Sequence, residues 1–310
     1  MRVLVTGGAG FIGSHIVDVL IKDGHDVAVV DDLSSGDARQ VNPKARLYSV
    51  DITDAQSLAK VFAKERPEVV SHHAAQTNVR HSMADPAFDA RVNVVGSVSV
   101  LQLCADHGVR KLVFASTCAV YSEPCYLPMD ESHPTGPQSA YGTSKLAVEG
   151  YLRLFADAHG LRYTTFRYGN VYGPRQDPRG EAGVVAIFTT QLLTGIQPTI
   201  FGDGNKTRDY VAVEDVAYAN LLVLGDAGDN QVFNVAWGEG VSDFGVFNAV
   251  RKASGVTMEP LYTDRRPGEA EHVSLDCARA RDQLGWTPTV QLREGTLKMV
   301  DAIRAQPFQA

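Results

Sequence analysis

Thr6-Gly7-Gly8-Ala9-Gly10-Phe11-Ile12-Gly13-Ser14-His15 follows directly after the apolar run Val3-Leu4-Val5 at the start of the chain. Glycines at positions 7, 10 and 13 let a strand turn tightly into a helix and let the backbone approach a bound group closely. The free N–H groups and the positive dipole end of such a helix bind a pyrophosphate. A strand, a glycine-rich turn and a helix in this order therefore predict a dinucleotide-binding unit.

A carboxylate stands at the spacing that this unit requires. Asp31 follows the apolar run 27–30 and lies 18 positions after Gly13, close to the roughly 20 positions typical of the acid that binds an adenosine ribose diol. A carboxylate there favours NAD over NADP, because it repels a 2′-phosphate. Asp31 and Asp32 could instead cap a loop, but the agreement of strand, glycines and acid favours NAD binding.

Short apolar runs alternate with longer helical stretches as far as Tyr168. The runs are apolar at consecutive positions, as expected of strands that helices cover on both faces. With right-handed crossovers, this rhythm predicts an α/β fold with a doubly wound parallel sheet of the Rossmann type. Helices are expected over 53–65 and 139–158, and further strands are expected at Val69-Val70, Leu112-Val113-Phe114 and Tyr163-Thr164-Thr165-Phe166.

The regular alternation of apolar runs and helical stretches ends after Tyr168. The stretch 173–180 is dense in glycine, proline and charge, which predicts a loop that borders the site or forms a mobile lid. A helix over 184–194, a strand ending at the turn 202–204 and a main-sheet strand at 231–235 follow. We therefore expect interleaved lobes: 1–170 plus about 210–238 as the NAD-binding domain, and about 171–209 plus 239–310 as a smaller mixed α/β substrate lobe.

The amino-acid composition argues against several classes of function. Lys and Arg number 29 against 36 Asp and Glu, a formal charge of −7, which argues against a general nucleic-acid binder. The sequence has neither an apolar run of about 18 residues nor a signal-peptide pattern, so we expect no membrane partner. Four cysteines without C-x-x-C spacing indicate reduced thiols and a cytoplasmic location. We expect no bound metal.

A candidate catalytic group lies in the second half of the sheet region. Tyr141 and Lys145 are four positions apart at the start of an expected helix, so both project from one face. Moving a phenol pKa from about 10 to about 7 takes roughly 4 kcal/mol, which a nearby ammonium and a cationic nicotinamide can supply. Thr117 ends a strand at the edge where open α/β sheets bind ligands. A surface Tyr and Lys and a turn-forming Thr are the alternatives.

Together these segments resemble the extended short-chain dehydrogenase/reductase family, and within it the UDP-glucose 4-epimerase group of nucleotide-sugar enzymes. The resemblance covers essentially the whole chain. It is carried by 6–13, Asp31, Asp51-Ile52, His73-Ala74-Ala75, Asn93, Ser116-Thr117, Tyr141-x-x-x-Lys145, Arg167-Tyr168-Gly169-Asn170, Arg208-Asp209-Tyr210-Val211 and Arg266-Pro267-Gly268-Glu269.

The resemblance implies a role for each matching residue. Tyr141 is the base, Lys145 binds the nicotinamide ribose, and Thr117 orients a sugar hydroxyl. The implied NAD contacts are Gly7, Gly10, Phe11, Ile12, Gly13, Asp31, Asp51, Ile52, Ala74, Ala75, Asn93, Tyr141 and Lys145. Asp51 is explained almost as well as the cap of the helix that begins near Thr53.

The resemblance also implies a UDP-sugar substrate. Asn170 contacts it at the lobe junction, Phe201 falls at the uracil pocket, and Arg208 and Arg266 grip the diphosphate. Forked guanidinium groups suit phosphate oxygens. Each arginine could equally be a solvated surface charge, and Phe201 could belong to the core.

The implied reaction is 4-epimerisation of a UDP-hexose through a transient 4-keto sugar. Related dehydratases and decarboxylases carry an acidic residue just after the threonine, where this chain has Cys118 and Ala119. This difference favours an epimerase. The alternatives are a 4,6-dehydratase or decarboxylase that uses another acid, and a non-catalytic NAD-sensing protein, which has no use for an activated phenol.

Two further expectations concern substrate size and assembly. Val273 falls near a position where a bulky aromatic side chain excludes N-acetylated sugars in some epimerases, so the smaller side chain is expected to admit an N-acetyl group. The helical stretches 93–106 and 141–158 fit the helix pairing of a homodimer, although their apolar faces could equally be internal core.

Overall fold

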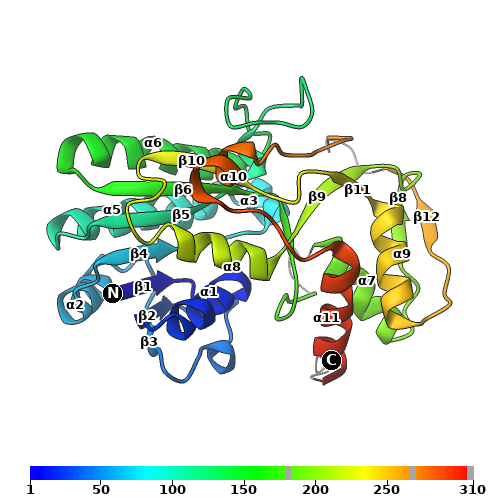
Figure 1. The fold of residues 1–310 in the computed structure, drawn as a ribbon, viewed down its shortest axis with the longest axis horizontal. Coiled ribbons are helices and arrows are strands. Elements are labelled where there is room, and N and C mark those ends of the chain that lie inside the picture. The colour runs from blue at the N-terminus through cyan, green and yellow to red at the C-terminus, as the bar shows by residue number, and fades with distance from the viewer. Residues whose placement is uncertain (179–182, 266–269, 306–310) are drawn as a thin grey trace.

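The computed structural model describes residues 1–178, 183–265 and 270–305, which form two lobes (Figure 1). The larger lobe is built on a seven-stranded sheet in the order β10-β6-β5-β4-β1-β2-β3, with every neighbouring pair parallel. This confirms the predicted doubly wound fold. The strands are β1 (Arg2–Thr6), β2 (Asp26–Asp31), β3 (Arg46–Ser49), β4 (Val69–His72), β5 (Lys111–Thr117), β6 (Arg162–Tyr168) and β10 (Gln231–Val235).

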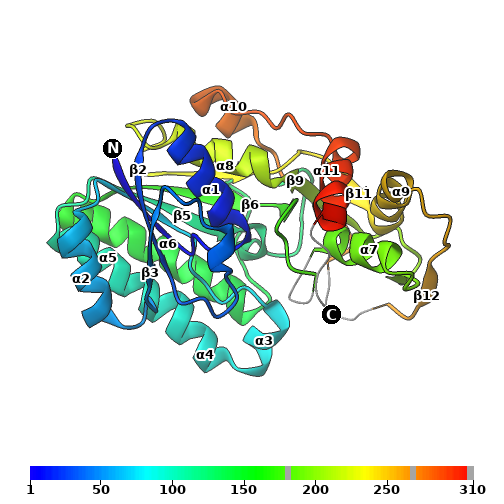
Figure 2. The ribbon, with the colours of Figure 1, turned by 90° about the horizontal axis from the view of Figure 1, so that it is seen from below.

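Helices cover both faces of this sheet (Figure 2). On one face lie α2 (Ala55–Glu65), α5 (Ser97–Asp106) and α6 (Ala140–His159), and on the other lie α1 (Phe11–Lys22) and α8 (Val213–Leu222). Two apolar clusters fill the two layers: one includes Phe62 and Leu152, and the other includes Ile16 and Phe166. Apart from the edge strand β3, whose residues are exposed or half-buried, the strands are buried from both sides, which explains their consecutive apolar residues.

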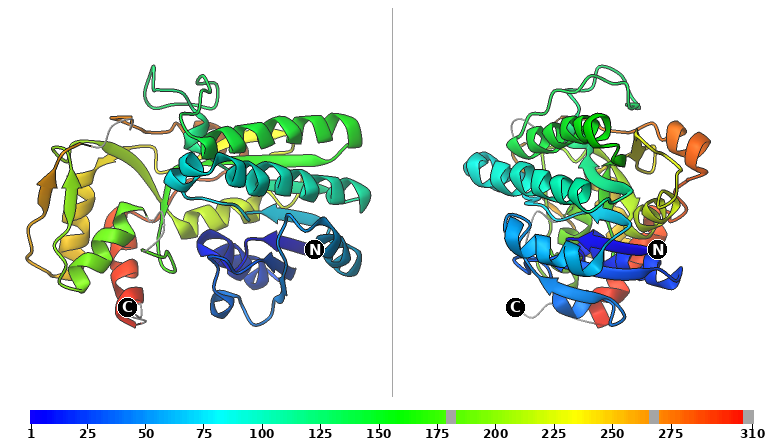
Figure 3. Two further views of the ribbon diagram at one scale, coloured as in Figure 1. Left: turned by 180° about the vertical axis from the view of Figure 1, so that it is seen from behind. Right: turned by 90° about the vertical axis from the view of Figure 1, so that its left-hand side faces the viewer.

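A chain of short helices joins β4 to β5. It comprises α3 (Val79–Ala84), α4 (Pro86–Ala90) and a π-helical segment, η2 (Arg91–Gly96), which continues into α5. The long helix α6 lies beside α5 (Figure 3). It begins where Ser139 Oγ accepts a hydrogen bond from Gly142 N at 3.1 Å and ends at Gly160, which adopts a left-handed φ of 69°. Two short 3₁₀ helices, η1 (Ala38–Gln40) and η3 (Cys118–Val120), lie in connecting loops.

The smaller lobe contains two small sheets. One has the order β11-β9-β7 and the other pairs β12 with β8. Aliphatic side chains together with aromatic ones, among them Tyr172, Phe188 and Phe247, form its core. Its elements are β7 (Asn170–Tyr172), α7 (Val184–Leu193), β8 (Thr199–Phe201), β9 (Thr207–Ala212), β11 (Gly240–Ser242), α9 (Asp243–Ser254), β12 (Leu261–Thr263) and α11 (Leu292–Ala305).

The chain passes between the lobes more than once. After β9 it returns to the main sheet as α8 and β10, and after β12 it returns again as α10 (Ala278–Leu284), which contacts β10. Trp286 joins the core of the main sheet. The interleaving follows the sequence expectation, while the exact division into two domains stays a prediction.

Most expected elements are confirmed within a few residues. The strand expected at 231–235 is β10, and the helix expected at 139–158 is α6. The helix expected at 53–65 begins at Ala55, because Asp54 Oδ1 accepts a hydrogen bond from Ser57 N at 3.1 Å and so caps it. Among the described residues, no helix combines the length and the apolar character needed to cross a bilayer.

Candidate active site

The glycine-rich turn forms a cradle between β1 and α1. Gly7 has a left-handed φ of 70°, and a Cβ at position 13 would lie 2.1 Å from the carbonyl oxygen of Gly7. Only glycine fits such a close approach. The N-cap, Gly10, offers no side-chain hydrogen bond, and the first turn of α1 holds no acidic residue. The first N–H groups of α1 therefore remain available to an anion, as a pyrophosphate requires.

Asp31 closes this cradle from the end of β2. Its two carboxylate oxygens each accept a backbone hydrogen bond at 2.9 Å, one from Ala9 N and one from Leu33 N. The side chain is buried, and burial raises the pKa of this carboxyl above its usual range. Each oxygen has a second lone pair, so the carboxylate can still accept a hydroxyl. Its place beside the glycine turn fits the predicted ribose contact.

The predicted adenine contacts lie after β3. Asp51 is exposed, and its Oδ1 accepts a hydrogen bond from Thr53 N at 2.7 Å. Ile52 is buried in the core beneath Gly96. The side chain of Ile52 therefore packs inward, and the role of both residues toward adenine stays a prediction.

Ala74 and Ala75 follow β4 and lie beside the glycine turn. Ala74 N donates to Thr6 Oγ1 at 3.2 Å, and a Cβ on Gly7 would lie 2.5 Å from Ala74 N. The loop after β4 therefore lies against the loop after β1. This contact brings the two predicted alanines and the glycine cradle to one edge of the sheet.

Asn93 belongs to a buried polar network behind this edge. Its side chain exchanges two hydrogen bonds of 2.9 Å with the backbone of Gln76, and its Nδ2 also donates to Asp89 Oδ1 at 3.0 Å. Asp89 accepts two further bonds, from Gln76 Nε2 at 2.9 Å and from Ser144 Oγ at 2.6 Å. The π-helical segment thus connects the loop after β4 with α6.

Tyr141, Lys145 and Thr117 come together at the carboxyl end of β5. Lys145 is buried; its Nζ donates to Ala115 O at 2.8 Å and lies 5.9 Å from the centre of the Tyr141 ring. A Cβ on Gly142 would lie 2.4 Å from Ala119 O, so glycine lets the start of α6 approach the chain just after Thr117. The predicted catalytic group is thus assembled from β5 and α6.

The electrostatics of this group are set mainly by burial. Burial raises the pKa of the Tyr141 phenol above its usual range, the charge of Cys118 acts in the same direction, and hydrogen bonding with Thr117 opposes them. Burial lowers the pKa of Lys145 to about 8, against the opposing charge of Asp89. Proton abstraction by Tyr141 therefore requires a positive charge beside the phenol.

The predicted substrate residues have different locations. Arg208, on β9, lies near enough to Cys118 for its charge to act on that thiol. Asn170 begins β7, opposite Tyr210 on β9, at the junction of the lobes. Phe201 ends β8 in the smaller lobe. Arg266 lies outside the described residues.

The loop at 173–178 is fastened to the first helix. His15 Nε2 lies 2.9 Å from Pro174 O, and Arg175 Nη2 forms an ion pair of 2.7 Å with Asp18 Oδ2. Both contacts join α1 to the start of the smaller lobe. This part of the loop therefore lies against the helix that begins at the glycine turn, and its border with the site stays a prediction.

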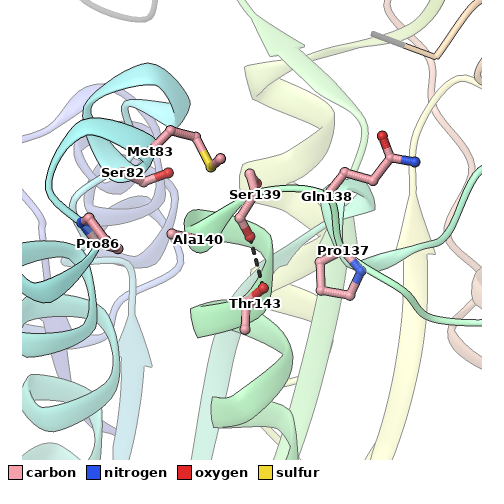
Figure 4. A pocket seen from close by; sticks show the side chains of 8 residues that line it. All are labelled: Ser82, Met83, Pro86, Pro137, Gln138, Ser139, Ala140 and Thr143. Carbon is pink, nitrogen blue, oxygen red and sulfur yellow. Dashed lines mark hydrogen bonds between the residues drawn. The ribbon is translucent and has the colours of Figure 1, made fainter. Parts of the chain in front are cut away.

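A surface pocket of about 340 Å³ lies beside the start of α6 (Figure 4). Its lining comes from α3, α4, the turn that precedes α6 and the first turn of α6, where Thr143 Oγ1 donates to Ser139 O at 2.9 Å. None of the residues that line it is titratable: they are Ser82, Met83, Pro86, Pro137, Gln138, Ser139, Ala140 and Thr143. This pocket therefore offers no side chain for proton transfer.

Sequence reasoning missed Gln76, Asp89 and Ser144. One signal pointed to Asp89, which stands four positions before Asn93 and so shares a helix face with it. Ser144 directly precedes Lys145, but its partner lies 55 positions away, so local spacing gives no indication of their bond.

Comparisons with known proteins agree with this geometry. The NAD dependent epimerase/dehydratase family matches residues 3–236. A UDP-glucose 4-epimerase of Mycolicibacterium smegmatis is 46% identical over 98% of this chain and 99% of its own. The crystal structure of a Thermotoga maritima UDP-glucose 4-epimerase with UDP-glucose has a TM-score of 0.96 at 46% identity, covering 98% of this chain and 99% of that one. A Thermus thermophilus UDP-glucose 4-epimerase in complex with NAD has a TM-score of 0.93 at 43% identity, covering 99% and 100%.

Proposed function

Since this chain belongs to the NAD dependent epimerase/dehydratase family, we propose that it is an NAD-dependent isomerase that interconverts the 4-epimers of a UDP-hexose. The observation that carries the proposal is the assembly of Tyr141, Lys145 and Thr117 at the sheet edge that also holds the glycine cradle. A base, a cation and a hydroxyl at a dinucleotide site suit oxidation and reduction at a sugar carbon.

The residues at the cradle fit NAD. Gly7 and Gly13 leave room for the pyrophosphate at the uncapped start of α1, and Asp31 offers oxygens to a ribose diol. Lys145 is proposed to donate to the nicotinamide ribose. When bound, NAD supplies the acceptor that takes a hydride from the sugar C4 and returns it to the other face.

Tyr141 performs the proton chemistry in this proposal. Its phenolate oxygen takes the proton from the sugar O4 during oxidation and gives it back during reduction. Thr117 hydrogen-bonds the same sugar oxygen and orients it. Lys145 stabilises the phenolate by its charge, offsetting the burial that raises the Tyr141 pKa. Burial also excludes water from the reacting atoms.

The substrate is proposed to lie across the lobe junction. Arg208, together with Arg266, grips the diphosphate, Asn170 contacts the sugar, and Phe201 contributes to the uracil pocket. The position of Arg208 close to Cys118, one residue after Thr117, supports this placement. Val273 is half-buried beside the cluster formed by Val120 and Leu275, and its small side chain supports acceptance of N-acetylated sugars.

The residues after Thr117 favour an epimerase over a dehydratase or decarboxylase. Burial raises the pKa of the Cys118 thiol to about 11, so it is a far weaker acid than a carboxyl group. Ala119 carries no acidic group. The 4-keto sugar therefore lacks, at these two positions, the carboxylic acid needed to eliminate water.

Product analysis by NMR tests the proposal. The purified protein is incubated with UDP-galactose and, in parallel, with UDP-N-acetylhexosamines and a UDP-hexuronate. We expect UDP-glucose to form from UDP-galactose without added reductant. Release of a 4-keto-6-deoxy sugar or of carbon dioxide would instead identify a dehydratase or a decarboxylase. NAD binding without conversion of any UDP-sugar in the panel would identify a sensing protein.

We also propose a homodimer formed through α4, η2, α5 and α6. Large apolar side chains on α4, η2 and α6 are exposed in the single chain: Phe88, Val95, Tyr151 and Leu154, with Leu154 56% exposed. A second copy that pairs the same helices would cover them. A cytoplasmic location is proposed as well, and the four free cysteines support it.

A further inference from the structure

Asp89 is a buried carboxylate that takes no part in the proton and hydride transfers of the proposed reaction. Its side chain on α4 is 0% exposed. Its three hydrogen-bond donors, Gln76, Asn93 and Ser144, are all uncharged. A buried carboxylate that accepts only from neutral donors keeps a desolvation cost that an ion pair would offset, so such a group is usually retained for a function.

The three donors come from the three segments that surround the catalytic group. Gln76 lies in the loop after β4, one residue beyond Ala75, and Asn93 lies in the π-helical segment. Ser144 lies on α6 between Tyr141 and Lys145, and its bond to Asp89 is the shortest of the three at 2.6 Å. Asp89 therefore fixes the start of α6 against the cofactor loop. π-helical segments are rare and occur mostly at functional sites.

Asp89 also acts on Lys145 through its charge. Burial lowers the pKa of Lys145 to about 8, and the carboxylate of Asp89 is the charge that opposes this shift. Among the described residues, Lys145 also faces the Tyr141 ring, 5.9 Å from its Nζ, and interacts with His72, which ends β4, and His73, which follows it. Burial lowers the pKa of both imidazoles to about 3, so both are neutral at physiological pH.

We propose that Asp89 is a positioning residue for the proposed reaction: it holds the start of α6 through Ser144 and keeps Lys145 in its ammonium form. The inference rests on the proposed function. The same negative charge raises the pKa of Tyr141, but there burial is the largest cause. Asp89 therefore favours the Tyr141 phenolate indirectly: it keeps Lys145 protonated, and the ammonium group of Lys145 stabilises the phenolate.

Asp89→Asn tests the charge. Without the carboxylate, Lys145 loses its proton at lower pH, so the alkaline limb of the kcat profile moves down by about one pH unit. At a pH on the new limb, kcat falls by up to about tenfold, while the KM for the UDP-sugar stays unchanged. Asp157→Asn, at the exposed end of α6, is the matched control and leaves both quantities at wild-type values.

A second readout does not depend on turnover. Competitive acetylation with acetic anhydride, followed by mass spectrometry of the Lys145 peptide, gives the midpoint pH at which the amine becomes reactive. We expect a lower midpoint in Asp89→Asn than in the wild type. This measurement tests the Asp89 proposal even if no UDP-sugar is converted, so its failure is distinguishable from that of the proposed function.

Ser144→Ala separates position from charge. It removes the 2.6 Å hydrogen bond but keeps the carboxylate, so kcat falls while the alkaline limb and the acetylation midpoint stay at wild-type pH. If Asp89→Asn does not fold, Ser144→Ala and Asp89→Glu carry the test, because both retain the charge. A downward shift of the limb in either one overturns the proposal, as does a wild-type acetylation midpoint in folded Asp89→Asn.

Discussion

Replacing Gly13 with alanine is expected to abolish tight NAD binding while leaving the protein folded. The Cβ that this change adds would lie 2.1 Å from the carbonyl oxygen of Gly7 and 2.8 Å from its carbonyl carbon. Both neighbours are backbone atoms in the turn that begins α1, so no side-chain rotation relieves the clash. The turn and the helix must separate.

The size of the effect follows from that separation. Relieving the contact takes a displacement of about 1 Å, which moves the N–H groups of the first turn of α1 away from the pyrophosphate. Losing one or two hydrogen bonds to a charged group costs roughly 3 kcal/mol, or about 100-fold in affinity. We therefore expect about 100-fold weaker NAD binding. The same overpacking costs about 1 to 3 kcal/mol in the free energy of unfolding.

Isothermal titration of cofactor-free protein with NAD measures the first effect, and urea unfolding measures the second. Gly225→Ala is the matched control, because a Cβ there meets no atom within 4 Å. It should bind NAD as the wild type does. If Gly13→Ala binds NAD within about threefold of the wild type, the reasoning about the cradle is wrong.

Three further changes test other parts of the molecule. Tyr141→Phe removes the base, so kcat is expected to fall by at least about 10²-fold with the UDP-sugar Kd nearly unchanged; retained turnover would exclude Tyr141 as the base. Arg167→Met leaves Glu149 buried without its ion pair of 2.7 Å and should lower the free energy of unfolding in urea by about 3 to 5 kcal/mol. A loss below about 1 kcal/mol would contradict this. Adding Glu149→Leu should restore most of the lost stability. Leu154→Asp places a charge on the proposed dimer face and should yield a monomer in analytical ultracentrifugation, whereas a persistent dimer would exclude that face.

The dinucleotide half of the site was predictable because its signals are local. Residues 6–13 specify a strand, a turn and a helix over a short span, and Gly13 can approach Gly7 only if both lack a side chain. The four-residue spacing of Tyr141 and Lys145 gave their shared helix face in the same way. These inferences need only the backbone periods of helices and strands.

The remaining features depend on contacts between distant segments. The small sheet pairs β7 with β9, where Asn170 lies opposite Tyr210, and β9 with β11, where Asp209 lies opposite Gly240, and no turn signal fixes pairing over such separations. The π-helical segment at 91–96 departs from the 3.6-residue period on which helix patterns rest. The side chain of Ile52 fills the space beneath Gly96, a contact that local spacing does not indicate, while its role toward adenine stays a prediction. The packing of segments that are distant in the sequence determines each of these features.

The late arrival of β10 has a consequence for how such a protein can be divided. A gene fragment that stops near residue 170 would encode six of the seven main strands and omit the one that covers residues 164–168 of β6. The bare edge would then offer its unpaired backbone to other copies, a recognised route to insoluble product. Recombination that replaces everything after residue 170 would therefore also replace β10, because this strand of the main sheet is encoded in that portion. The replacing segment must supply a strand that pairs with β6.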